Sequence, residues 1–281
     1  MIWLWLLLAH AAAPGSPFAF REVGAGRLEL SENGRPVFVY NYGMQLKEGA
    51  PEDRQRCCYL HPVWTPAGTV VTDDFPADHY HHRGIFWAWP RVKIGDQIVD
   101  LWSIRGIRHK FLRWGARETG PDRARLEAVN GWFTGERQVL TETVTITAHR
   151  SAQGTRRLGF TLALEALEPL EIAGEPAQGK GYGGFSIRFG PRRQTLIRTD
   201  SGVEKGDSNM APHPWAELDG DFDGHRATVR IEIDPAHPGF PSGWCLRHYG
   251  FLGVNYPGLE WLRLEPGRPL RLSYRVLVSD R

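Results

Sequence analysis

Hydrophobic and polar residues alternate with a period of two along most of the chain, which is the pattern of strands with one buried face. Residues 158–164 carry leucine or phenylalanine at every second position. The same alternation runs through residues 229–233 and through residues 270–278. No stretch shows the spacing of a helix of three turns, so the pattern predicts an all-β protein.

Two-residue turns separate several of these predicted strands. Asn33-Gly34 lies between two alternating segments, and Gly95-Asp96 lies between two others. Such dipeptides favour the tight turns of β-hairpins. No change of composition marks a linker, so residues 14–281 are expected to form a single domain. The length favours a large two-sheet antiparallel β-sandwich.

Composition supports this fold class and narrows the function. The 281 residues include 32 glycines and 20 prolines, which would interrupt the helices of a bundle. A hydrophobic content of 41% is enough to bury a sizeable core. The net charge of +2 predicts no nucleic-acid partner. The 11 tryptophans fit a core, and they also fit the ring-lined sites that bind sugars.

The first 13 residues form a short apolar run that ends in small residues. This pattern resembles a secretory signal peptide, with a buried first strand as the alternative. The run is too short to span a bilayer, and no later run reaches about 18 apolar residues. We therefore expect an exported protein, periplasmic or secreted, with no membrane span.

The chain has three cysteines, of which Cys57 and Cys58 are adjacent and Cys245 stands alone. Three cysteines are too few for a disulfide framework. The sequence leaves open whether Cys245 pairs with Cys57 or Cys58, or whether all three are buried thiols.

The densest chemical signal is the segment 73–84, which holds three of the 11 histidines within four residues. In an extended chain His79, His81 and Arg83 face one way, and His82 faces the other. Two imidazoles on one strand face often hold a metal ion, so His79 and His81 are candidate ligands of a divalent metal. The alternatives are metal-free binding or acid–base chemistry, and a surface loop without function.

A metal site would need further ligands, for which Asp73, Asp74, Glu142 and His248 are candidates. The segment does not match the metal-binding cupin signature, because Ile85 and Phe86 stand where a glutamate is required. A metal is therefore an option and not a requirement of this sequence.

Glu142 interrupts an apolar strand face that is otherwise formed by Leu140, Val144 and Ile146. A carboxylate on such a face must be paired, have a raised pKa or line a cavity. These environments suit a general base, and the alternative is a residue that reaches solvent or an arginine at the sheet edge.

A further polar cluster follows Trp244. Alternation places Cys245, Arg247 and Tyr249 on one side, where the arginine and the tyrosine can hydrogen-bond sugar hydroxyls or a carboxylate. Arg188 occupies the polar face of another predicted strand, opposite the face of Phe185 and Ile187.

The sequence resembles a bacterial family of unknown function whose members carry the label methane oxygenase PmoA, and the matching motifs occur in the same order along the chain. The resemblance covers residues from about 37 to 256 and rests on these motifs: Tyr59 through Gly68, Asp73-Asp74-Phe75-Pro76, His79 through Ile85, Trp132, Thr141-Glu142-Thr143, Gly184 through Arg188, Trp215, His237-Pro238, Trp244, Arg247 and Tyr249-Gly250. Membrane methane oxygenases need several spanning helices, which this chain lacks, so the activity in that label is not adopted.

The resemblance implies a β-supersandwich similar to galactose mutarotase, in which a glutamate and histidines act on a pyranose. The leading hypothesis is an exported carbohydrate-active protein, with epimerisation, hydrolysis or elimination as its chemistry. The alternatives are a non-catalytic carbohydrate-binding module and a metal-dependent oxygenase. The expected catalytic residues are His81, His82, Arg83 and Glu142, and the expected substrate-binding residues are Asp74, His79, Trp102, Arg188, Arg247 and Tyr249.

Overall fold

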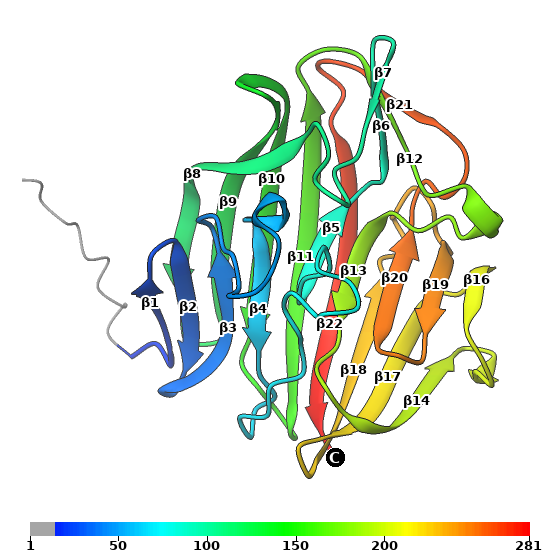
Figure 1. Cartoon of the computed structure of the whole chain (residues 1–281). Coiled ribbons are helices and arrows are strands. Elements are labelled where there is room, and N and C mark those ends of the chain that lie inside the picture. The colour runs from blue at the N-terminus through cyan, green and yellow to red at the C-terminus, as the bar shows by residue number, and fades with distance from the viewer. Residues whose placement is uncertain (1–14) are drawn as a thin grey trace, which may run out of the picture.

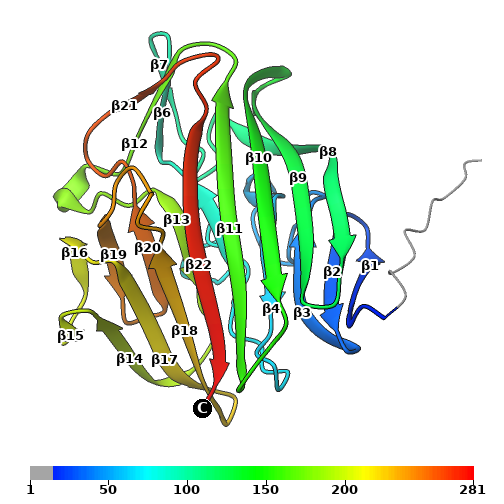
Figure 2. The same cartoon turned by 180° about the vertical axis from the view of Figure 1, so that it is seen from behind.

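The structure is a computed structural model that describes residues 15–281, and it consists of antiparallel strands in three sheets. Two nine-stranded sheets pack face to face, and a four-stranded sheet lies at one end of the sandwich (Figures 1 and 2). The first sheet runs in the order β1 (Phe18–Gly24), β2 (Arg27–Glu32), β3 (Arg35–Asn41), β4 (Tyr59–Val63), β5 (Ile85–Ala88), β13 (Gly184–Arg188), β20 (Phe251–Asn255), β19 (Gly243–Arg247) and β16 (Ser208–Pro212).

The second sheet covers one face of the first and is nearest the viewer in Figure 2. Its order is β15 (Gly202–Val203), β14 (Arg193–Thr199), β17 (Trp215–Phe222), β18 (His225–Ile233), β22 (Leu270–Asp280), β11 (Thr155–Ala166), β10 (Arg137–His149), β9 (Arg123–Thr134) and β8 (Arg108–Thr119). The small sheet contains β21 (Leu262–Leu264), β12 (Leu170–Ala173), β6 (Arg91–Ile94) and β7 (Gln97–Val99). Two short 3-10 turns, η1 (Glu52–Arg54) and η2 (Ala177–Gly179), complete the described secondary structure.

The two-sheet antiparallel sandwich predicted from the alternation is confirmed, with the small third sheet as an addition. The predicted hairpins are also present, because β2 pairs with β3 across Asn33-Gly34 and β6 pairs with β7 across Gly95-Asp96. Asn33 and Gly34 both have positive φ, at 50° and 76°, as a tight hairpin turn requires. Within residues 15–281 no helix is long and apolar enough to cross a bilayer.

The core lies between the two large sheets, where the inward faces of long strands meet. On β10 the residues Leu140, Glu142, Val144 and Ile146 are buried, as the alternation predicts. Trp87 and Trp89 on and beside β5 are also buried in this core. The leader segment expected over residues 1–13 lies outside the described residues.

Strand β13 differs from the simple alternation, because all five of its residues are buried. Ser186 and Arg188, on the face opposite Phe185 and Ile187, are only 1% and 6% exposed. Strand β13 is therefore covered on both faces, by the core on one side and by a layer of loops on the other.

The three cysteines are free and buried. Cys57 and Cys58 lie with their sulfur atoms 3.2 Å apart, whereas Cys245 lies on β19. Cys245 therefore forms no bridge with either of the adjacent pair in this structure.

Candidate functional site

A pocket of about 340 Å³ opens among the loops that cover the outer face of the first sheet, and we call it the histidine pocket. Larger surface hollows exist, of about 580 and 980 Å³, but each is lined by a single histidine. The histidine pocket instead joins three histidines with aromatic and cationic side chains. Its lining residues are His79, His81, His82, Trp102, Lys180, Tyr182, Cys245, Arg247, Tyr249 and Phe251.

The histidines lie on two consecutive turns and not on a strand. The amide of His79 bonds to the carbonyl of Pro76 at 2.9 Å, and the amide of His82 bonds to the carbonyl of His79 at 2.8 Å. A turn brings residues three apart to the same side, which the extended geometry assumed from the sequence does not. The imidazoles of His79 and His82 consequently stack, with ring centroids 4.5 Å apart and planes inclined by 5°.

Aromatic rings complete the walls around these imidazoles. Tyr249 stacks on the imidazole of His79, with 5.3 Å between the two ring centroids. Trp102 stands edge-on to His82 at 5.7 Å and lies 5.0 Å from Tyr182. The walls are therefore rigid rings, which limits the orientations that a flat ligand can take.

Burial and neighbouring positive charges keep two of the imidazoles neutral at physiological pH. The pKa of His81 is lowered to about 3, first by burial and then by the charges of His79, Arg56 and Arg54. The pKa of His82 is lowered well below its ordinary value, again first by burial. His82 is 3% exposed, and its Nδ1 has no hydrogen-bond partner among the described residues.

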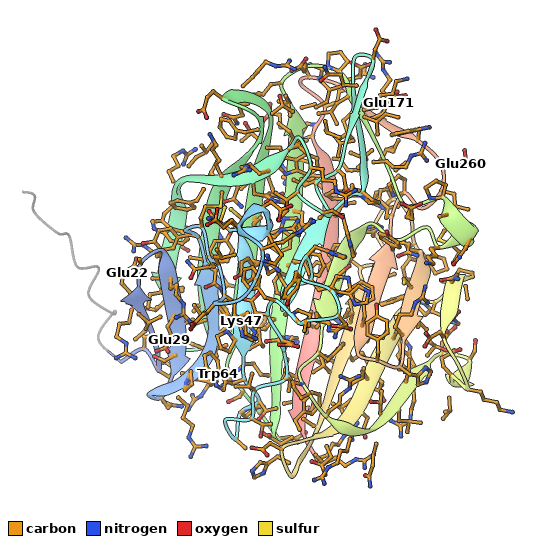
Figure 3. The ribbon with its side chains drawn as sticks, viewed as in Figure 1. Glu22, Glu29, Lys47, Trp64, Glu171 and Glu260 are labelled. Carbon is orange, nitrogen blue, oxygen red and sulfur yellow. The ribbon has the colours of Figure 1, made fainter. Side chains whose placement is uncertain are left out.

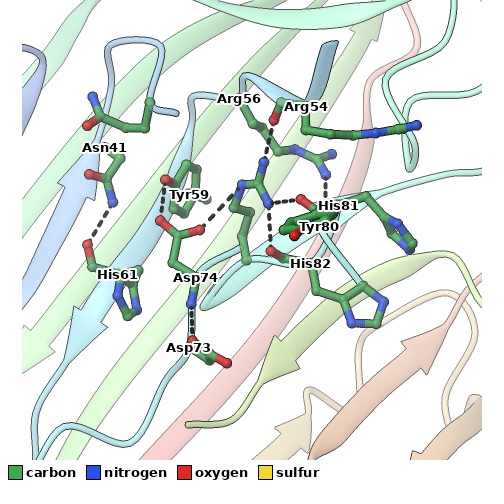
Figure 4. A network of polar contacts seen from close by, with 12 residues as sticks. Asn41, Arg54, Arg56, Tyr59, His61, Asp73, Asp74, Tyr80, His81 and His82 are labelled. Carbon is green, nitrogen blue, oxygen red and sulfur yellow. Dashed lines mark hydrogen bonds and ion pairs between the residues drawn. The ribbon is translucent and has the colours of Figure 1, made fainter. Parts of the chain in front are cut away.

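Arg83 is buried and bonds to the backbone of the histidine turns, among the polar contacts of Tyr80, His82 and Asp74 that Figure 4 shows. Its guanidinium donates to the carbonyls of Tyr80, His82 and Arg54 at 2.6–2.7 Å, and it stacks 3.5 Å from the ring centroid of Phe75. Because all of these partners are backbone or core groups, the guanidinium has no face left for a ligand. Arg83 was expected in the site as a catalytic group, and it is instead a buried support of the site.

Asp74 belongs to the same support. Its carboxylate accepts a hydrogen bond of 2.7 Å from the hydroxyl of Tyr59 and lies 3.4 Å from Nε of Arg83. Burial, opposed by the charge of Arg83, raises the pKa of Asp74 to about 6. Asp74 does not line the histidine pocket, contrary to the expectation that it binds substrate.

A second arginine connects the histidine turns to the loop that carries Trp102. Arg56 is 3% exposed and donates to the carbonyls of Leu101, Trp102 and His81 at 2.9–3.4 Å. Burial, together with the charge of Arg83, lowers the pKa of Arg56 to about 9. One guanidinium thus sets the distance between two walls of the pocket.

Arg188 acts behind the pocket wall. Its guanidinium bonds to both carboxylate oxygens of Asp78 at 2.8 and 2.9 Å, and Asp78 lies 3.0 Å from Nδ1 of His79. Burial opposes the charged form of Asp78, but hydrogen bonds from His79 and Arg188 hold its pKa below the ordinary value. Arg188 was expected to touch substrate, but it does not line the pocket and instead orients His79 through Asp78.

Glu142 lies in the core between the large sheets and not at the histidine pocket. Its carboxylate accepts hydrogen bonds from Asn130 at 2.9 Å and from Trp132 at 3.0 Å, and it lies 3.3 Å from Nε2 of His109. Burial would raise the pKa of Glu142, but the charge and hydrogen bond of His109, with Asn130 and Trp132, lower it. The expectation that a carboxylate on this face must be paired holds, but the structure does not bring it to the histidines.

The structure therefore divides the predicted site residues into two groups. Six of them line the histidine pocket: His79, His81, His82, Trp102, Arg247 and Tyr249. Four do not: Asp74, Arg83, Glu142 and Arg188. The alternation predicted around Trp244 is present in the structure, because Cys245, Arg247 and Tyr249 line the pocket while Trp244 is buried in the core.

A metal ion is not supported by the donor atoms that the structure groups together. Within residues 15–281 no three side chains of histidine, cysteine, aspartate or glutamate are arranged to hold one. The rings of His79 and His81 are 5.6 Å apart and inclined by 79°, and Asp73, Glu142 and His248 do not line the pocket. No chemical step is therefore assigned to a metal.

Five residues important to the pocket are not predicted by the sequence patterns: Arg54, Arg56, Lys180, Tyr182 and Phe251. Lys180 and Tyr182 belong to the glycine-rich segment 180–184, whose composition alone does not indicate a sugar site. Arg54 and Arg56 carry no local signal, because their partners are backbone carbonyls of segments distant in the sequence.

Several solved structures are similar to the chain at low identity. They include a candidate kojibiose phosphorylase from the human microbiome (TM-score 0.40, 11% identity, 95% of this chain and 30% of that chain). They also include a galactose mutarotase related enzyme from Lactobacillus acidophilus (TM-score 0.39, 7% identity, 94% of this chain and 97% of that chain). A heparinase III aligns with a TM-score of 0.37 and 8% identity over 96% of this chain and 36% of its own.

The chain thus spans about a third of the length of two of these enzymes and nearly all of the third. Alignments at these scores carry no inference about function. No curated protein sequence matches the chain. A family model does match it, over residues 27–281, and the chain therefore belongs to the family of unknown function DUF6807.

Proposed function

We propose that the histidine pocket is the active site of a carbohydrate-active enzyme that transfers protons to and from a bound sugar. The observation that carries the proposal is the combination of aromatic walls and two neutral imidazoles in one small pocket. Export to the periplasm or the medium is part of the proposal and rests on the sequence of residues 1–13.

The size and walls of the pocket support a sugar as ligand. A volume of about 340 Å³ is at the lower end of the range for small-molecule sites. Trp102, Tyr182 and Phe251 present ring faces or edges, against which the C–H groups of a pyranose pack well. The surrounding imidazoles, the phenol of Tyr249 and the guanidinium of Arg247 supply hydrogen-bond partners for hydroxyls.

The protonation states support acid–base chemistry. His81 and His82 are neutral at pH 7 and can each accept a proton. Burial raises the pKa of the Tyr249 phenol, so it is protonated at pH 7 and can give its proton to a sugar oxygen on which negative charge develops. In ring opening, an imidazole takes the proton of the anomeric hydroxyl while the phenol protonates the ring oxygen. In hydrolysis the imidazole takes a proton from a water that attacks the anomeric carbon, and in elimination it takes the proton of a ring C–H group. In both, the C–O bond to the leaving group breaks and the phenol protonates the leaving oxygen.

A non-catalytic sugar-binding module is the second candidate function. The observation that favours it is the low pKa of His81, about 3, because an imidazole with such a pKa is a weak base. The two candidates share the pocket and differ in whether the bound sugar is converted.

The test is a panel of mono- and disaccharides in which binding and conversion are measured on the same samples. Calorimetry gives the binding, and NMR follows anomer exchange, new reducing ends and unsaturated products. Conversion that falls at least about 100-fold in Tyr249→Phe, which keeps the ring stack on His79, supports the enzyme. His225→Ala, an exposed histidine outside the pocket, is the matched control. Binding without conversion supports the module, and the absence of both across the panel overturns the proposal.

A further inference from the structure

In the described part of the chain, the side chains that line the histidine pocket carry positive but no negative charge. Two cationic side chains, Lys180 and Arg247, line the pocket, whereas no carboxylate of residues 15–281 does. Acidic side chains such as Glu22 and Glu29 on β1 and β2, and Glu171 and Glu260 on the opposite side, lie at the edges of the molecule (Figure 3).

Lys180 has no acidic partner. Of the lysines in the described part of the chain, only Lys93 and Lys110 form ion pairs. Lys180 is half-buried at the pocket, and its charge acts on the thiol of Cys245 across the lining. An ammonium in such a place is incompletely solvated and unpaired, which favours an anion beside it.

Arg247 is also only weakly neutralised. Its guanidinium donates to the carbonyls of Ser208 and Leu246 at 2.8 and 2.9 Å and to the side-chain oxygen of Asn209, and these neutral acceptors fix its position. The nearest carboxylate is that of Asp207, 4.0 Å from Nε and half exposed to solvent. A pair of that length at the surface cancels little of the charge that Arg247 presents to the pocket.

Three arginines lie in the layer behind the pocket, two of them paired with a carboxylate. Arg56 is buried and has only carbonyl partners, and Arg54 pairs with the exposed Asp53. Arg188 is neutralised by Asp78, but its Nε and Nη1 have no partner among the described residues, and the residue is 94% buried. Carboxylates also act on this region, because Asp100 lies near Arg56 and Tyr182, and Glu175 lies near Tyr182. The charge presented at the pocket surface is therefore that of Lys180 and Arg247.

We propose that the ligand of the histidine pocket is a sugar that carries an oxyanion group, as a uronic acid, a sugar phosphate or a sugar sulfate does. The inference rests on the proposed sugar-binding function and adds the charge of the ligand. Lys180 and Arg247 hold the oxyanion, and the aromatic walls hold the ring. The anion supplies the negative charge that the pocket lacks.

A bound oxyanion would also change the basicity of His81 and His82. Burial first, and the positive surroundings after it, make each imidazole a poor proton acceptor, and a bound anion cancels part of the second effect. A neutral sugar would leave His81 and His82 as they are. An acidic ligand therefore favours proton transfer more than a neutral sugar does, which couples substrate charge to catalysis.

The experiment compares the binding of glucose, glucuronic acid, glucose 6-phosphate, glucose 6-sulfate and inorganic phosphate to the full chain by calorimetry at low and high salt. We expect at least one acidic sugar to bind about tenfold or more tightly than glucose, with an affinity that falls as salt rises. Lys180→Gln should weaken the binding of that acidic sugar about tenfold and change the affinity for glucose less than about twofold. Lys47→Gln, which removes an exposed lysine that does not line the pocket, is the matched control.

The outcomes separate this inference from the proposed function. The inference that the ligand carries an oxyanion is wrong if glucose and all acidic sugars bind with equal affinity, or if Lys180→Gln weakens the binding of both equally. Either result would still be compatible with a sugar site. Inorganic phosphate that binds as tightly as every acidic sugar overturns the sugar and with it the proposed function. No binding by any of these probes or by the wider sugar panel overturns both. If Lys180→Gln loses affinity for one acidic sugar but not for glucose, the inference is supported and the oxyanion group is identified.

Discussion

Replacing Glu142 tests whether this carboxylate supports the fold or takes part in the chemistry. It is fully buried and satisfies Asn130, Trp132 and His109 at 2.9–3.3 Å. Removing one member of a buried charge pair costs about 3–5 kcal/mol, and each buried donor left without an acceptor costs about 1–3 kcal/mol. We therefore expect Glu142→Ala to lower the free energy of unfolding by about 3–5 kcal/mol.

That loss is a large part of the total, because domains are stable by about 5–15 kcal/mol. It corresponds to a fall in Tm of roughly 10 °C. Glu142→Gln keeps the volume and one acceptor oxygen, so it should lose roughly half as much. Glu165→Gln, on the exposed face of the neighbouring strand β11, is the control and should change Tm by no more than about 2 °C.

The pH dependence gives a second measure of the same effect. The pKa of Glu142 in the folded chain is lowered from its ordinary 4.5, so its contribution to stability is present above that value. The contribution is lost as the pH falls through the lower pKa of the folded state. The difference in Tm between the natural chain and Glu142→Gln should therefore shrink below pH 4.5.

The assay is thermal and denaturant unfolding, with ligand binding measured under conditions where each variant is fully folded. Binding should stay within about twofold of the natural chain, because Glu142 does not line the histidine pocket. A Glu142→Gln protein of unchanged Tm that loses conversion of its ligand would refute this reasoning. The carboxylate would then belong to the mechanism.

Three further predictions concern the pocket and the acid sensitivity of the fold. His81→Ala should abolish ligand binding or conversion while Tm changes by less than about 3 °C; a variant that unfolds, or one that keeps full activity, contradicts this assignment. Treatment with a chelator should leave binding of the best sugar unchanged, and stoichiometric transition metal in gently purified protein would count against the present site. Tm should fall between pH 6.5 and about pH 4, because burial lowers the pKa of His237 to about 4; the folded chain then binds fewer protons than the unfolded one, and His237→Gln should reduce the fall.

The local pattern of the sequence is enough to predict the strands and several turns. Alternation reports burial directly, because successive side chains of a strand point to opposite faces. It placed Cys245, Arg247 and Tyr249 on one side, and these three do meet at the pocket. The same rule failed for the histidines, because the turns from Pro76 to His79 and from His79 to His82 replace an extended chain.

The partners of charged side chains could not be predicted from local pattern, since they come from distant parts of the chain. The sequence alone shows that Glu142 is an unusual residue on an apolar face. It does not show whether the carboxylate is paired with a ligand or with His109. Arg83 likewise follows three histidines in the sequence, but its guanidinium donates hydrogen bonds to the carbonyls of Tyr80, His82 and Arg54.

The sequence by itself determined an antiparallel β-sandwich and a segment of unusual chemistry between residues 73 and 84. Only the tertiary structure decided which of the polar residues share a pocket. It separated Glu142, in the core, from His81 and His82, in the loop layer, and it added Lys180 to the latter. The physical reason is that hydrophobic periodicity is a property of neighbouring residues. The pairing of charges depends on which strands and loops meet in space.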